Sequence, residues 1–187
     1  MKLLVTLLIF FLNSFLCHAY TFHTGTYVPY FNKIQTNTSG DVKKFDLNPY
    51  IGVSNQLNLS GPHFFMPELG YTYFTETAKN TEKDIIHLNY NFLYILTQSF
   101  ALRYGLSNNW YRLKGQGGSV QLSNGTGSTN FPSPDKTVTT YYTTLNVGGE
   151  YIFGSRKFGL RFDYQTMSFQ ELDNRAYNYL LTLNFYR

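Results

Sequence analysis

A repeated alternation of apolar and polar residues constrains the fold of this chain more than any other feature of its sequence. In residues 84–96 the even positions are apolar from Ile86 onward, and polar side chains lie between them at His87, Asn89 and Asn91. A period of two is typical of a β-strand with one apolar face, because successive side chains point to opposite sides. Seven more segments alternate, the first three clearly and the rest with interruptions: 100–110, 157–166, 177–185, 65–75, 139–153, 45–53 and 22–31. The sequence therefore predicts eight strands and no helix of useful length.

The connections between these segments alternate between short and long. A tight turn at Gly154-Ser155 joins two of the strands, whereas residues 114–136 form a long connection that is rich in Gly and contains two Pro. Such composition is typical of a loop. An even number of antiparallel strands would place both termini and the short turns at one end, and the long loops at the other.

Residues 1–19 have the pattern of a secretory signal peptide. Lys2 precedes an apolar run that ends at Leu16, and Cys17-His18-Ala19 follows with small residues at its first and third places. The run is shorter than the roughly 20 residues that a membrane-spanning helix needs. We therefore expect cleavage after Ala19 and a single exported domain, residues 20–187. Cys17 is the only cysteine, so the mature chain would have no disulfide, no thiolate metal site and no cysteine nucleophile.

The low charge indicates which face of the strands meets water. Only 14% of the residues are charged, against roughly 25% in an ordinary soluble domain. A soluble lipocalin-like barrel is apolar inside, whereas a membrane barrel is apolar outside. The polar face here carries mainly Asn, Thr, Ser and Gly, which favours an enclosed interior. Lys and Arg are scattered, so no nucleic-acid surface is expected. Aromatic residues near the strand ends, Tyr27, Tyr50, Tyr73 and Trp110 among them, predict the girdles of a membrane barrel.

Five charged residues lie in mid-strand on the polar face, which predicts a charge network inside the barrel. One interpretation is a static network that neutralises buried charge and sets the strand register. The other is a gate, in which ion pairs exchange to open a narrow path. The first interpretation agrees better with the high cost of an uncompensated buried charge. The five residues are Glu68, Arg103, Glu150, Arg161 and Asp163.

With these features the chain resembles the small eight-stranded outer-membrane barrels of Gram-negative bacteria, the group typified by the OmpA membrane domain and OmpX. In that family the last strand alternates apolar residues, ends on an aromatic residue and is recognised by the barrel-assembly machinery. This chain departs from the pattern, because Tyr186 and Arg187 follow the last apolar position. The resemblance assigns the role of C-terminal assembly signal to Tyr177, Tyr179, Leu181, Leu183 and Phe185.

The resemblance implies an eight-stranded, antiparallel, up-and-down transmembrane β-barrel in the bacterial outer membrane, in contact with outer-membrane lipid and lipopolysaccharide. A monomer is expected, since closure leaves no strand edge in the wall. Eight strands leave an interior that side chains fill, so wide porin-like diffusion is not expected. The implied function is structural, or an interaction with a surface ligand through the long external loops.

Three alternatives stay open at this stage. They are a narrow, gated pore for small solutes, a lipid-modifying enzyme, and a soluble lipocalin-like carrier. A lipase-like enzyme would need a base such as His87, but no serine of the chain lies in a nucleophile-elbow motif. No calcium-loop spacing is present either. We therefore predict that the protein is not an enzyme and has no catalytic, cofactor-binding or metal-binding residue.

Overall fold

The computed structural model describes residues 20–29, 35–36, 42–43, 46–75, 81–123, 128–154, 157–167 and 175–187. The expected signal peptide lies outside the described residues. Eight strands form the wall of a barrel: β1 (Tyr20–Val28), β4 (Asn48–Asn55), β6 (His63–Tyr73), β7 (Thr81–Ile95), β8 (Phe100–Gly115), β11 (Val138–Ile152), β12 (Phe158–Met167) and β13 (Ala176–Tyr186). The remaining strands are β2 (Gln35–Thr36), β3 (Val42–Lys43), β5 (Leu57–Ser60), β9 (Ser119–Ser123) and β10 (Ser128–Pro132).

The wall is closed and antiparallel throughout. Each wall strand pairs with the wall strand before and after it in the chain, and the pairing of β1 with β13 closes the ring, for example at Gly25 opposite Thr182. β5 continues the line of β4 and pairs with β6. The prediction of an eight-stranded up-and-down barrel is confirmed, and each predicted segment overlaps one wall strand. Even the poorly alternating segment 22–31 contains most of β1, which ends at Val28 just before Pro29.

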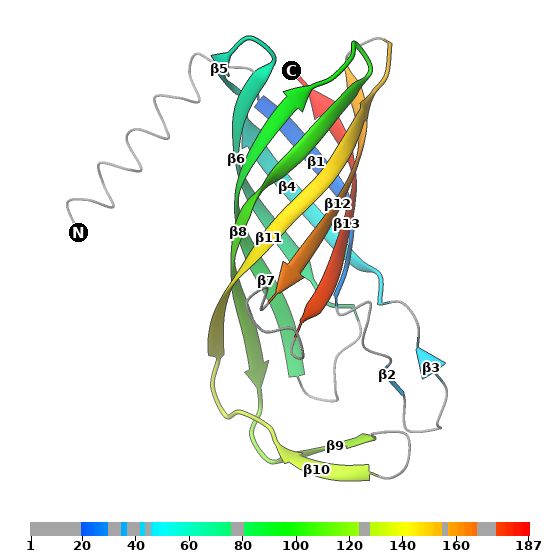
Figure 1. The fold of residues 1–187 in the computed structure, drawn as a ribbon. Coiled ribbons are helices and arrows are strands. Elements are labelled where there is room, and N and C mark those ends of the chain that lie inside the picture. Colours follow the sequence, from blue (N-terminus) through cyan, green and yellow to red (C-terminus); the bar gives the residue numbers. More distant parts are fainter. Residues whose placement is uncertain are drawn as a thin grey trace, which may run out of the picture.

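Figure 1 shows that the two ends of the barrel differ. The C-terminus, the β5–β6 connection and the other short turns lie at one end, here called the turn end; the β2–β3 and β9–β10 pairs lie at the other, the loop end. The predicted loop 114–136 is wrong in part, because residues 119–123 pair with residues 128–132 as a hairpin. Gly117 and Gly118 lead into this hairpin with φ of 77° and 81°, a conformation that glycine adopts without strain.

The apolar face of the wall points outward and the polar face points inward. On β12, Leu160 and Phe162 are exposed, whereas Arg161 and Asp163 between them are buried. This is the reverse of a lipocalin-like barrel, so the alternative of a soluble carrier with an apolar cavity is wrong. The outward apolar side chains instead form the kind of belt that a lipid bilayer covers.

Three neighbouring strands extend further than the other wall strands at the loop end. β7, β8 and β11 have 15, 16 and 15 residues, whereas the other wall strands have between 8 and 11. β6 ends at Tyr73, opposite Asp84 of β7, and β12 ends at Met167, opposite Thr144 of β11. We call the projecting part the raised sheet; it consists of residues 81–84, 111–115 and 138–141.

Candidate functional site: the barrel lumen

The structure brings the five predicted lumen residues together. Glu68, Arg103, Glu150, Arg161 and Asp163 are all at most 1% exposed. They come from β6, β8, β11 and β12, which are strands from opposite parts of the wall. Their side chains meet because each occupies the inward position of its strand.

Arg161 joins two of the carboxylates. Its Nη1 lies 2.6 Å from Glu68 Oε2, and its Nη2 lies 2.5 Å from Asp163 Oδ2. Its Nε also donates to Asp163 Oδ2, at 2.7 Å. A guanidinium suits this position, because its planar array of donors can serve two carboxylates at once.

Arg103 extends the same network to the third carboxylate. Its Nη1 donates to Glu150 Oε2 at 2.8 Å, and its Nη2 lies 3.6 Å from Glu68 Oε2. Two arginines thus face three carboxylates. Neutral donors stabilise the second oxygen of both glutamates: Tyr50 and Asn89 donate to Glu68, and Asn184 and Tyr186 donate to Glu150.

Sequence reasoning missed His23, which adjoins this network. Its Nε2 lies 3.7 Å from Glu68 Oε2 and 2.8 Å from the Ser54 hydroxyl, and its Nδ1 lies 2.7 Å from Asn184 Oδ1. Because the Asn184 amide nitrogen donates to Glu150, its oxygen faces the imidazole. We therefore assign the proton to Nδ1, which leaves Nε2 to accept the Ser54 hydroxyl.

His87 repeats this arrangement on the other side of the glycine pair Gly52 and Gly70. Its Nδ1 lies 2.7 Å from Asn109 Oδ1, and its Nε2 lies 2.9 Å from the Thr72 hydroxyl. Across the strands His23 is opposite Gly52, Gly52 is opposite Gly70, and Gly70 is opposite His87. Although a hydroxyl, a histidine and an amide in series resemble a hydrolase relay, the Thr72 hydroxyl is buried. Both histidines serve as hydrogen-bonding residues of the packed lumen.

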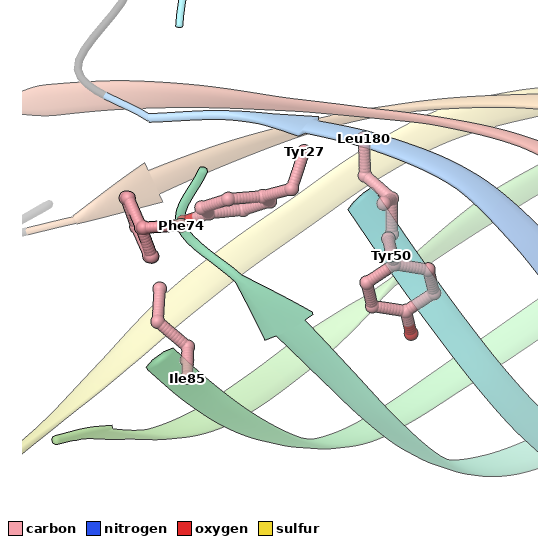
Figure 2. Packing of buried hydrophobic residues seen from close by; sticks show 5 residues of the cluster. All are labelled: Tyr27, Tyr50, Phe74, Ile85 and Leu180. Atoms are coloured by element: carbon pink, nitrogen blue, oxygen red, sulfur yellow. The ribbon is translucent and has the colours of Figure 1, made fainter. Parts of the chain in front are cut away.

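Two apolar layers close the lumen above and below the charge network. The loop-end plug consists of Tyr27, Tyr50, Phe74, Ile85 and Leu180, and Figure 2 shows these side chains gathered inside the wall. The turn-end plug consists of Met66, Leu93 and Ala101, with Phe64 and Ile95 packed against it. The buried residues of both plugs are at most 2% exposed. The plugs therefore separate the charge network from both ends of the barrel.

The placement of Tyr27 and Tyr50 corrects the predicted aromatic girdle. Both point into the lumen and are 1% exposed, whereas Tyr73 stays on the outside at 48%. Tyr50 lies on the inward face of β4 together with Ser54. The alternation of this strand was the sequence signal that could have predicted its inward direction. Glycine makes the room: a Cβ on Gly70 would overlap the Tyr50 ring, and a Cβ on Gly148 would overlap the Asp163 carboxylate.

Lys83 covers the loop-end plug from the side of the raised sheet. Its ammonium lies 4.2 Å from the centre of the Phe74 ring and 4.8 Å from that of Tyr111. Burial lowers the pKa of Lys83 to about 8, and the nearby Asp46 carboxylate opposes this shift. The lysine therefore sits between water and the apolar interior of the barrel.

The five residues of the predicted assembly signal lie on the outward face of β13. Phe185 contacts Phe158 edge-on at 5.4 Å, and Tyr179 stacks on Phe162 at 5.4 Å. Of the two residues beyond the signal, Tyr186 turns into the lumen, and the backbone N–H of Arg187 donates to Tyr20. These contacts join the last strand to both of its neighbours. The recognition role of Tyr177, Tyr179, Leu181, Leu183 and Phe185 stays a prediction.

The described residues contain neither a metal-ligand cluster nor a helix that could cross a membrane. No three or more His, Cys, Asp or Glu side chains among them are grouped so that they could hold a metal ion. The described segments also include no helix of the length and apolar character needed to cross a membrane.

Comparison with solved structures identifies the fold. No protein-family model and no curated protein sequence matches the chain. The crystal structure of Ail, the attachment invasion locus protein of Yersinia pestis, matches with a TM-score of 0.51 and 8% identity, over 91% of this chain and 99% of Ail. Ail in complex with the heparin analogue sucrose octasulfate gives 0.52 and 10% over the same shares. Neisserial surface protein A gives 0.47 and 14%, over 90% and 95%. At these identities the likeness concerns the fold alone: the chain has the fold of the small eight-stranded outer-membrane β-barrels.

Proposed function

We propose that this protein is an integral outer-membrane barrel without a solute pathway, and that its raised sheet binds a partner outside the cell. The observation that carries this proposal is the projecting end of β11. Residues 138–141 are exposed on the strand, with Val138 at 47% and Tyr141 at 54%. Among the described residues their backbone pairs with β8, and pairing of β11 with β12 begins only at Thr144.

An edge strand of this kind is suited to accept another strand. Among the described residues no strand lies on the outer side of 138–141, and the N–H and C=O groups there form a row that a second extended chain can complete. Natural proteins usually blunt such an edge with Lys, Pro or a bulge. Residues 138–141 read Val-Thr-Thr-Tyr, which has high strand propensity and carries no charge. We therefore propose an extended segment of a surface protein as the partner.

The outer face of the raised sheet supports the same function. At its base, Tyr141 lies beside Trp110 of the barrel wall, with the ring centres 5.6 Å apart. Further from the barrel, Arg112 pairs with Asp84 at 2.6 Å and Lys114 with Glu82 at 3.2 Å. These cross-strand pairs hold the projecting strands in register. The partner would therefore meet a preformed sheet.

Filling of the lumen argues against the pore alternative. A solute would have to displace both plugs as well as the network that Arg103 and Glu150 join between them. We expect no single-channel conductance in planar bilayers, and none after Arg103→Ala or Glu150→Ala, because either change leaves both plugs in place. Discrete conductance in either variant would favour the gated pore instead.

A cysteine pair tests the location and orientation. The mature chain has no cysteine if the leader is cleaved, so Thr140→Cys and Leu59→Cys each introduce a single thiol at opposite ends of the barrel. We expect a membrane-impermeant maleimide to label Thr140→Cys on intact cells. Leu59→Cys should react only after the outer membrane is permeabilised. Labelling in the opposite order would reverse the orientation.

The binding role is tested with the same strand. Bacteria that express the protein should attach to a layer of cultured epithelial cells in greater number than bacteria that lack it. Thr140→Pro should abolish this increase in attachment, because proline removes a backbone donor and distorts the edge. Leu59→Pro at the turn end is the matched control and should retain attachment. Equal attachment by both variants would contradict the role of the raised sheet.

A further inference from the structure

A cavity of about 470 Å³ opens inside the barrel at the turn end. Leu93, Ile95 and Ile152 give it an apolar lining, and Gln56, Thr97 and Tyr186 add amide, hydroxyl and ring groups. None of its lining residues is charged. Its volume falls within the range of roughly 300–1,000 Å³ that is usual for ligand sites. Leu93 also belongs to the turn-end plug, so the cavity ends where the closed lumen begins.

A strand edge lies beside this cavity. Among the described residues β5 pairs with β6 alone, and Leu59 on it is 56% exposed. β1, the neighbour of β4 on the other side, begins at Tyr20 opposite Asn55. Only residues before Tyr20 could continue β1 to a position opposite Gln56 or β5. The predicted cleavage after Ala19 removes those residues from the mature chain.

One added strand could pair with the edge of β5 and also reach the cavity. A strand that continued the line of β1 would place a residue opposite Gln56. Gln56 shares the parity of Ser54, which points into the barrel. The side chain opposite Gln56 would therefore point into the cavity, while its neighbours in the strand would point outward.

We infer that the turn end of the barrel binds an extended peptide segment of a periplasmic protein, through the edge of β5 and with one uncharged, apolar side chain in the cavity. Backbone pairing would supply affinity, and the cavity would supply specificity, as in other cases of strand addition. The uncharged lining disfavours a carboxylate or phosphate ligand, because a buried charge needs a partner. The amides and hydroxyls of the rim suit a peptide backbone.

The inference rests on the proposed orientation in the outer membrane but not on the raised sheet. The protein, exported with its own leader and purified from outer membranes, is reconstituted in lipid nanodiscs. The probe is the peptide Ac-Thr-Val-Thr-Leu-Thr-Lys-NH2 with a fluorophore on the lysine. We expect a saturable rise in fluorescence anisotropy. The same peptide with Asp in place of Leu should bind at least tenfold more weakly.

Two variants on one strand test whether the cavity takes part in binding. Ile152→Trp fills the cavity and should weaken binding at least tenfold. Val147→Trp, on the outward face of the same strand at 55% exposure, should leave binding unchanged. A heat-dependent shift in gel mobility checks that both variants fold. Absence of saturable binding, or equal binding by Ile152→Trp and the unaltered protein, would overturn the inference.

Hydrogen exchange shows where the peptide lies. We expect the probe to slow exchange at residues 57–60. Slowing at residues 138–141 instead would overturn this inference while supporting the proposed function of the raised sheet. The intact mass of the purified protein shows whether residues before Tyr20 are retained. If they are retained and the peptide does not bind, the position beside β5 is assigned to the chain's own N-terminal segment. That result would also overturn the inference.

Discussion

The middle of the lumen and its two ends are filled in opposite ways. The middle holds charged side chains whose partners come from distant strands, as in the pair of Arg161 with Glu68. The two plugs hold aromatic and aliphatic side chains that pack mainly through apolar contact. The Tyr50 hydroxyl also donates to Glu68 and so ties the loop-end plug to the middle. A buried ion pair adds little net stability, yet loss of one partner is severe because the other charge is left unpaired. The middle therefore specifies which strands face one another, whereas the ends exclude water.

The largest expected effect comes from breaking the middle. Arg161→Ala removes the group that bridges Glu68 and Asp163, and should lower the free energy of unfolding by about 3–5 kcal/mol. Urea titration of the protein in lipid vesicles measures this, with heat-modified gel mobility as the readout. Arg112→Ala is the matched control, because that side chain is 39% exposed in its pair with Asp84 and should lose about 1 kcal/mol or less. Similar losses in both variants would show that burial of the network does not matter.

A plug residue should matter slightly less and through a different mechanism. Phe74→Ala opens a hole in the loop-end plug and should destabilise the barrel by roughly 3 kcal/mol. Its chain neighbour Tyr73→Ala is the control, because Tyr73 points outward from the barrel at 48% exposure and its removal leaves no internal cavity. The same urea titration compares them. We also expect no conductance from Phe74→Ala, since the charge network and the turn-end plug remain; open channels would make the loop-end plug the sole barrier.

The wall of the barrel was predictable from the sequence and its filling only in part. Period-two alternation is clear in most wall strands because one face is apolar along most of its length, so the strands and the inward charges could be predicted. The plugs could not be predicted from hydropathy, because Tyr27 and Tyr50 look like girdle residues until the parity of β1 and β4 is known. His23 was missed for a related reason: β1 alternates poorly, and its partners Ser54 and Asn184 lie on strands far away in sequence. The β9–β10 hairpin was hidden by glycine-rich composition.

Glycine connects the two regions, and a third substitution tests this with an intermediate effect. Gly70→Ala would drive a Cβ into the Tyr50 ring, which belongs to the loop-end plug and also donates to Glu68 of the network. We expect a loss of about 1–3 kcal/mol, as for other cases of overpacking. Gly154→Ala is the control, because a Cβ there meets nothing within 4 Å, and it should change stability by less than about 0.5 kcal/mol. If Gly70→Ala leaves the free energy of unfolding unchanged, Tyr50 can move aside without loss of stability.

The smallest effect is expected where the loop-end plug meets water, and it depends on pH. Burial lowers the pKa of Lys83 from 10.5 to about 8, so between these values the unfolded chain binds more protons than the folded one. The free energy of unfolding should therefore rise with pH through this window and stay level below it. Contact of the ammonium with Phe74 and Tyr111 favours the charged form and offsets part of the gain, which leaves on the order of 1 kcal/mol. Urea titrations from pH 7 to pH 10 should show a smaller slope for Lys83→Met than for the unaltered protein. Lys114→Met, whose side chain is 62% exposed, should keep the full slope; an unchanged slope in Lys83→Met would place Lys83 in water rather than over the plug.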